Sequence, residues 1–160
     1  LCREAISDDE LYFVPAFTGL GAPHWKSNAK ASLTGITRTT GKAEIVRAGI
    51  ECIAYQITDV VRAMEADAGV KVKELRVDGG PTKNGYLMQF QSDILGGNVL
   101  VPDAEELSGI GVAYAAGIAM GIYTMDLFKL MKRKTYSKEM DENMSRKKYS
   151  GWKKAVGNLM

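Results

Sequence analysis

The 160-residue sequence is poor in the side chains that most often bind metals or act as nucleophiles. It contains one histidine, His24, and two cysteines, Cys2 and Cys52, which lie far apart. A histidine-based metal cluster and a disulfide framework are therefore excluded, and the lack of a C-x-x-C pair argues against structural zinc. Free thiols are typical of a reducing compartment, so we expect a cytoplasmic location.

Common catalytic loops are missing as well. The sequence has neither a G-x-S-x-G nucleophile elbow nor a G-x-x-x-x-G-K-[ST] phosphate loop. Gly19 and Gly21 are spaced like the start of a dinucleotide fingerprint, but His24 occupies the third glycine position and Pro23 would interrupt the required helix. No pattern pairs the acidic residues, so we assign neither a catalytic residue nor a metal ligand.

Charge and hydropathy exclude two further classes. A formal net charge of +2 is too small to indicate a nucleic-acid partner. The segment 109–123 is uncharged, but it is shorter than a membrane span of about 20 residues and contains few large apolar side chains. We therefore expect no membrane partner. The chain opens on polar and acidic residues rather than a signal peptide and lacks an initiator methionine, which favours a fragment or a processed piece.

The periodic segments predict an α/β protein whose sheet is incomplete. We divide it into loops and short strands (1–41), an α/β core (42–123) and a C-terminal helical tail (124–160). Within these, strands are expected at 11–14, 31–37, 75–77 and 98–102, and helices at 42–68, 81–95 and 107–123.

Two helical patterns are specific enough to predict which side chains are buried. The longest helix carries an aliphatic stripe at steps of four and three residues, which we expect to face the core: Val46, Ile50, Ile53, Ile57, Val60 and Met64. In the tail, Tyr149, Trp152 and Val156 could dock a terminal helix. The basic run 132–134 before it is interpreted as a solvated helix end.

The stretch 75–90 is the candidate functional site. It predicts a strand, a tight turn at Gly79 and Gly80, and then a helix. A turn without Cβ atoms lets a ligand lie against the backbone, and the helix start offers free N–H groups. Asn84 could present its amide to a polar ring edge. Many such turns are only structural corners, so the local sequence leaves both interpretations open.

Several longer strings in this sequence resemble the glycerol kinases of the FGGY carbohydrate kinase family. The resemblance covers nearly the whole chain, although His24 and the segment 108–111 depart from the usual pattern. It rests on VPAFTGLGAP (14–23), the segment 31–51, RVDGG (76–80), LMQFQSDILG (87–96) and YSGWKKAV (149–156).

The resemblance implies an actin/ribonuclease-H-like ATPase fold of which this chain holds an incomplete C-terminal domain. It implies transfer of the γ-phosphoryl group of ATP, with Mg²⁺, to glycerol. Gly80 and Asn84 match the family's nucleotide-contacting glycine and adenine-contacting asparagine, and Gly79 lies in the same turn. The first phosphate loop, most of the polyol site and the catalytic aspartate belong to an N-terminal kinase domain that this sequence lacks. We therefore expect the chain to be inactive alone, and the whole enzyme to be a homo-oligomer.

Two alternatives stay open at this point. The chain could belong to another FGGY sugar kinase, because the residues that recognise the substrate lie outside it. It could also be a free-standing nucleotide-binding or interaction module whose exposed sheet edges promote self-association.

Overall fold

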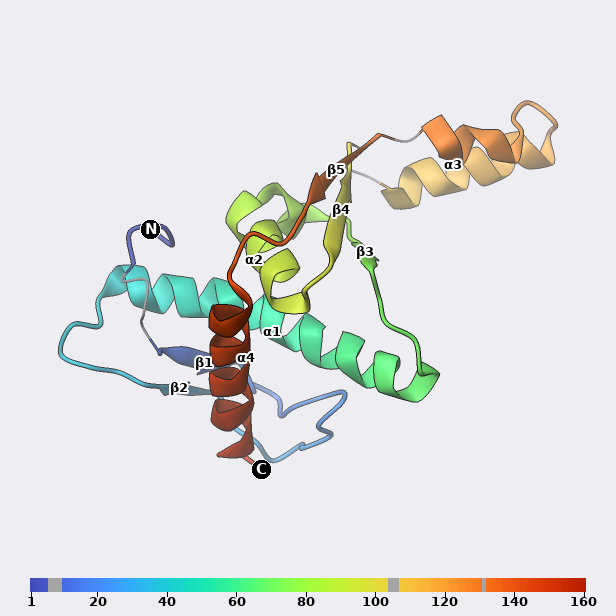
Figure 1. Cartoon of the computed structure of the whole chain (residues 1–160). Helices are drawn as coiled ribbons and strands as arrows, with labels where there is room; N and C mark the ends of the chain where they lie inside the picture. Colours follow the sequence, from blue (N-terminus) through green and yellow to red (C-terminus); the bar gives the residue numbers. More distant parts are fainter. Residues whose placement is uncertain (6–9, 104–106, 131) are drawn as a thin grey trace.

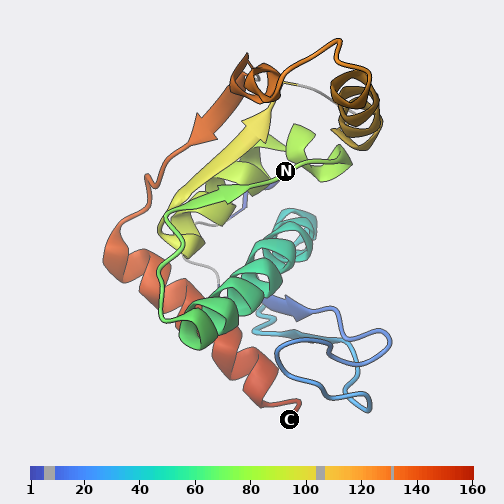
Figure 2. The same ribbon diagram turned by 90° about the vertical axis from the view of Figure 1, so that its right-hand side faces the viewer.

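The computed structural model describes residues 1–5, 10–103, 107–130 and 132–160. In this part of the chain, α1 (Lys42–Ala68) lies between two β-layers (Figure 2). On one side is an antiparallel pair, β1 (Tyr12–Val14) and β2 (Ser32–Thr34). On the other side α2 (Gly85–Leu95) separates α1 from a three-stranded sheet (Figure 1).

The three-stranded sheet has the order β3-β4-β5. Its strands are β3 (Glu74–Arg76), β4 (Asn98–Pro102) and β5 (Arg133–Tyr136). β3 runs parallel to β4, with Leu75 opposite Val99, and β5 pairs antiparallel to β4. The parallel pair is joined through α2, as expected for a β–α–β unit. The alternation predicted by the sequence is confirmed, with one further strand in the tail.

α1 has the bounds that the sequence predicts, because both ends carry local signals. The Glu44 Oε2 atom accepts a hydrogen bond from the Gly41 N–H at 2.9 Å, which satisfies a donor at the N-terminus. Gly69 ends the helix in the left-handed conformation at a φ of 66°.

The prediction that the aliphatic stripe of α1 faces the core is wrong. Ile53, Val60 and Met64 are 37%, 38% and 60% exposed. Among the other members, Ile50 is half-buried against the core, and Val46 and Ile57 are half-buried.

The buried face of α1 carries small and polar residues instead, including Ala48, Cys52 and Tyr55. Several of its polar groups have hydrogen-bond partners in distant segments, although the buried Tyr55 hydroxyl has none among the described residues. Gln91 donates to the Thr58 hydroxyl at 3.0 Å from α2. Periodicity identifies the aliphatic side of a helix, but these long-range partners determine which side is buried here.

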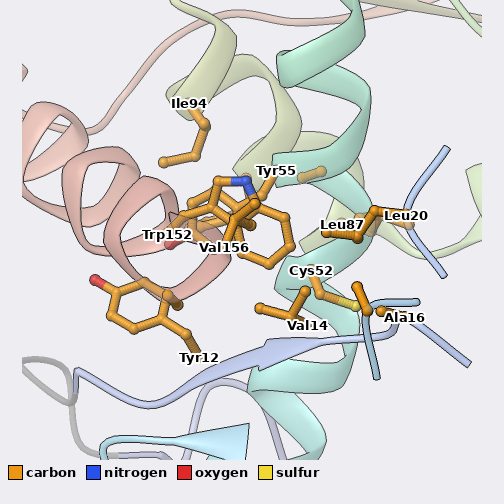
Figure 3. Close-up of a cluster of buried hydrophobic side chains, with 14 of the residues drawn as sticks. Tyr12, Val14, Ala16, Leu20, Cys52, Tyr55, Leu87, Ile94, Trp152 and Val156 are labelled. Atoms are coloured by element: carbon orange, nitrogen blue, oxygen red, sulfur yellow. The ribbon is translucent and has the colours of Figure 1, made fainter. Parts of the chain in front are cut away.

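The core gathers side chains from α1, α2, β1 and the last helix, α4 (Glu142–Gly157), as Figure 3 shows. The Tyr55 ring stacks on Trp152 at 5.2 Å between centroids and meets Phe90 edge-on at 5.4 Å. Trp152 and Val156 are each 1% exposed. The predicted docking of a terminal helix is therefore confirmed.

The interpretation of the basic run 132–134 as a helix end is wrong. After a 3-10 helix at Met125–Leu130, Arg133 and Lys134 enter β5. Lys134 lies over the Tyr136 ring at 4.6 Å, so its charge is held on the strand. Charged residues are common on edge strands because they hinder pairing with other chains. The sequence analysis interpreted the run only as part of a helix and did not consider an edge strand.

The third helix, α3 (Leu107–Ala119), stands apart from α1 and α4 in both views (Figures 1 and 2). It is shorter than the predicted 107–123, because the chain turns at Gly121 with a φ of 71°. Glu105 and Glu106, which precede this helix in the sequence, lie outside the described residues. No helix that the structure describes is both long enough and apolar enough to cross a bilayer.

Candidate functional site

The glycine turn lies where the parallel strands end. The chain leaves β3 at Arg76 and reaches Gly79, whose φ of 91° is in the region that favours glycine. The carboxyl end of the neighbouring parallel strand, β4, is at Pro102. In open α/β sheets, ligands bind in the crevice outside such strand ends.

The turn is fixed by its own hydrogen bonds. The Thr82 hydroxyl donates to the Gly79 carbonyl oxygen at 2.7 Å, and the Thr82 N–H donates to the same oxygen at 3.1 Å. Gly80 begins a 3-10 helix, Gly80–Lys83, and a Cβ atom built on it would meet no other atom within 4 Å. The backbone at Gly80 therefore faces open space.

The predicted single helix after the turn is split in two. The 3-10 helix ends at Lys83, and α2 begins only at Gly85. The Asn84 Oδ1 atom accepts hydrogen bonds from the N–H groups of Tyr86 and Leu87, at 3.1 and 3.2 Å. These two amides are engaged by the cap, which corrects the expectation of free N–H groups at this helix start.

Asn84 therefore has a structural role that the sequence analysis did not assign. Because its Oδ1 atom caps α2, the chemistry left for a ligand is the donor capacity of its Nδ2 group. It is half-buried, and it is not among the residues that line the adjacent cavity.

A cavity of about 690 Å³ opens beside the turn. Gly79 and Gly80 line it, so the structure brings together two of the three predicted site residues. The strand ends add Pro102 and Asp103, and β5 adds Tyr136. The other charged lining residues are basic, and the sequence analysis did not assign them to the site: Lys83, Lys132, Arg133 and Lys134.

The basic lining gives the cavity an electrostatic preference. Among the lining residues that the structure describes, four cationic side chains outnumber the one carboxylate, that of Asp103, so an anionic ligand is favoured over a cation. The sequence signal that could have indicated this basic lining is the run 132–134. Only the pairing of β5 with β4, however, places that run opposite the glycine turn. Among the described residues, no group of three or more His, Cys, Asp or Glu side chains is placed to hold a metal ion.

The base of the turn is anchored to α1 through Tyr86. The Tyr86 hydroxyl donates to the Glu51 Oε1 atom at 2.6 Å, and Glu51 also lies 3.8 Å from the Arg47 Nε atom. Burial raises the pKa of Tyr86, and the negative charge of Glu51 raises it further. The phenol therefore stays protonated, and the first turn of α2 keeps its place on α1.

Three comparisons with known proteins agree with this architecture. Residues 3–120 match the FGGY family of carbohydrate kinases, C-terminal domain. The chain is 45% identical over 159 residues to the glycerol kinase of Streptococcus agalactiae and 46% identical over 153 residues to that of Streptococcus pyogenes. These alignments cover 98% and 94% of this chain, but only 32% and 30% of the relatives.

Solved structures likewise match nearly all of this chain with about a third of their own length. The crystal structure of Plasmodium falciparum glycerol kinase with ADP is 36% identical, with a TM-score of 0.89 over 99% of this chain and 32% of that one. The gluconate kinase of Lactobacillus acidophilus, at 21% identity and a TM-score of 0.82, has the same fold.

The fold is therefore that of the actin/ribonuclease-H-like ATPases, present here as part of an α/β domain. The chain belongs to the FGGY family of carbohydrate kinases and matches its C-terminal domain. It spans about a third of the length of the glycerol kinases that it matches.

Proposed function

We propose that this chain is the nucleotide-binding C-terminal part of a cytoplasmic, ATP-dependent glycerol kinase. The observation that carries the proposal is the open backbone at Gly80, in a turn at the carboxyl ends of two parallel strands. The glycerol kinase of Streptococcus agalactiae supports the substrate, because it matches 98% of this chain at 45% identity. The similarity to Plasmodium falciparum glycerol kinase, which was crystallised with ADP, supports the nucleotide.

Each site residue has a specific role in this proposal. Gly79 and Gly80 let the nucleotide lie against the backbone. The Nδ2 group of Asn84 donates to an acceptor nitrogen of the adenine ring. The basic lining of the cavity offsets the negative charge of the nucleotide. Mg²⁺ enters with the phosphates, whose oxygens are its preferred ligands.

The same proposal makes the isolated chain inactive. Phosphoryl transfer depends on positioning and on charge stabilisation around the γ-phosphate. We assign the catalytic aspartate, the first phosphate loop and the glycerol site to the N-terminal kinase domain of a complete enzyme. Purified chain incubated with glycerol and MgATP should release no ADP above the blank. Clear turnover would refute this part of the proposal.

Calorimetric titration with MgATP tests the nucleotide site. The chain should show saturable binding, and Gly80→Val should abolish it. The branched side chain would occupy the ligand's space, whereas the protein itself offers no clash within 4 Å of the added Cβ atom.

Gly21→Val is the matched control, because a Cβ atom there also meets nothing within 4 Å. This variant should bind MgATP as the unmodified chain does, and both variants should keep their helix content by circular dichroism. Binding that survives Gly80→Val would remove Gly80 from the site.

A further inference from the structure

Tyr86 connects the start of α2 to the interior of the protein. Its hydroxyl donates to the Glu51 carboxylate on α1 at 2.6 Å, and its ring stacks on Phe90 with 6.1 Å between centroids. Glu51 is 4% exposed, and the Nζ atom of Lys148 on α4 lies 3.7 Å from its Oε2 atom. The carboxylate that receives the Tyr86 hydroxyl is therefore itself held between two helices.

The hydrogen bonds of the glycine turn itself are local. In the described chain, those of Gly79, Thr82 and Asn84 all stay within the turn and the first residues of α2. They fix the shape of the turn, but not its place on the rest of the protein. On the strand side, the Val77 N–H donates to the Leu100 carbonyl oxygen at 3.1 Å. On the helix side, the place of the turn depends on how α2 is held.

Two kinds of contact hold α2. Leu87 and Phe90 are buried in the core, at 2% and 3% exposed, but the burial of apolar groups is non-directional. The hydrogen bond from Tyr86 to Glu51 is directional, because such bonds weaken steeply when their angle departs from the preferred range. This bond therefore fixes the first turn of α2 more narrowly than apolar burial alone.

Tyr86 is also a backbone donor to the Asn84 side chain. The N–H groups of Tyr86 and Leu87 both hold the Asn84 Oδ1 atom. Because the side-chain amide is planar, its Nδ2 group can point only away from these two donors. A binding group is effective only when it is held within about 0.5 Å of its productive position. The first turn of α2 thus sets where the Asn84 amide can meet a ligand.

We propose that Tyr86 and Glu51 are positioning residues of the nucleotide site, which hold the Asn84 amide in place for the adenine ring. This inference rests on the proposed function, in which Asn84 contacts the nucleotide. Neither Tyr86 nor Glu51 lines the cavity beside the glycine turn. The effect passes from Glu51 to the Tyr86 hydroxyl, and from the Tyr86 N–H to Asn84.

Tyr86→Phe tests the proposal by removing one hydroxyl from a side chain that does not touch the ligand. Titration of the isotope-labelled chain with MgATP, followed by NMR at the Gly80 N–H, measures weak and strong binding alike. The dissociation constant should rise at least about fivefold in the variant, since residues in one hydrogen-bond network are energetically coupled.

Tyr149→Phe is the matched control. The Tyr149 hydroxyl donates to the Asp59 Oδ1 atom at 2.7 Å, so the same deletion again removes a short bond to a buried carboxylate of α1. Tyr149 lies on α4 and is not part of the glycine turn. The two variants should lose similar amounts of stability against urea, but Tyr149→Phe should change MgATP affinity by less than about twofold.

A double variant shows whether Tyr86 acts through Asn84. In the Asn84→Asp background the amide that Tyr86 positions is already gone. Adding Tyr86→Phe should then weaken MgATP binding by less than about twofold further, whereas independent effects would multiply. A full multiplication of the two effects would contradict the proposed route through Asn84.

Hydrogen exchange without nucleotide separates this inference from the proposed function. Exchange of the residue 86 and Leu87 amides, which Asn84 caps, should be faster in Tyr86→Phe than in Tyr149→Phe. Equal exchange in the two variants, or MgATP binding that survives Tyr86→Phe, would overturn the inference. An unmodified chain that binds no MgATP would instead refute the nucleotide site, and the positioning role with it.

Discussion

The Nε1 atom of Trp152 donates a hydrogen bond to the Oδ2 atom of Asp59 at 2.7 Å, across 93 positions of sequence. The Tyr149 hydroxyl donates to the Oδ1 atom of the same carboxylate, also at 2.7 Å, and His24 Nε2 lies 3.2 Å from its Oδ2 atom. One buried carboxylate thus joins α1, α4 and the loop after β1. His24 anchors this loop, while the neighbouring Trp25 is 78% exposed.

Replacing this carboxylate should destabilise the whole fold. Asp59→Ala leaves the Trp152 N–H and the Tyr149 hydroxyl without their acceptor, and we expect a loss of about 3 kcal/mol in the free energy of unfolding. Urea denaturation measures it. Asp67→Ala, at an exposed position on the same helix, should change stability by less than about 0.5 kcal/mol. Equal effects of the two variants would contradict the role of Asp59.

The two functions of Asn84 can be separated by two substitutions. Asn84→Asp keeps an oxygen acceptor for the N–H groups of Tyr86 and Leu87, so α2 should remain capped. It removes the amide donor, so MgATP binding measured by calorimetry should weaken at least tenfold. Asn84→Ala should weaken binding and also cost about 1 kcal/mol of stability. Unchanged binding in Asn84→Asp would limit Asn84 to its structural role.

Glu65 should make stability depend on pH in the acidic range. Its carboxylate accepts hydrogen bonds from the Val72 N–H and from Arg62 Nη1, each at 2.8 Å. The Val72 bond lowers the pKa of Glu65 most, and Arg62 lowers it further. Because the folded pKa lies below the unfolded one, the stabilisation is complete above the ordinary value of 4.5 and is lost as the pH falls through the lowered pKa.

Glu65→Gln should flatten this part of the pH dependence, which urea denaturation at several pH values measures. Asp67→Asn is the control on the same helix and should keep the acidic loss of stability. A Glu65→Gln variant that loses stability on acidification as steeply as the unmodified chain would contradict the assignment.

The two cysteines should differ in reactivity. Cys52 is 4% exposed and its thiol donates to the Gly49 carbonyl oxygen at 3.2 Å, while burial raises its pKa to about 11. Since the thiolate is the nucleophile, Cys52 should resist maleimide at neutral pH. Cys2 is only half-buried and should react first.

Mass spectrometry should detect one modified thiol in the folded chain and two in the denatured chain. Cys52→Ser should leave the fast reaction unchanged, and Cys2→Ser should abolish it. Rapid double labelling of the folded chain would contradict the burial of Cys52.

The sequence by itself determined the elements that carry their own end signals. Gly41 with Glu44 and Gly69 define α1, and the strand formers 98–102 define β4. The glycine turn was predicted from the same kind of local signal. A backbone conformation that other residues rarely adopt requires glycine at that position, so the turn can be recognised in the sequence. The motifs of the FGGY family added the roles of Gly80 and Asn84, which stay predictions.

Only the tertiary structure decided which face of α1 is buried and what surrounds the glycine turn. Asp59 and Thr58 are buried because Trp152 and Gln91 reach them from distant elements, and no local pattern contains that information. Strand pairing likewise brings the basic segment 132–134 to the turn, more than 40 positions from Gly80 in the sequence. The periodicity of a sequence shows how side chains are arranged around one helix or strand. Burial and binding also depend on the residues that other elements bring next to it.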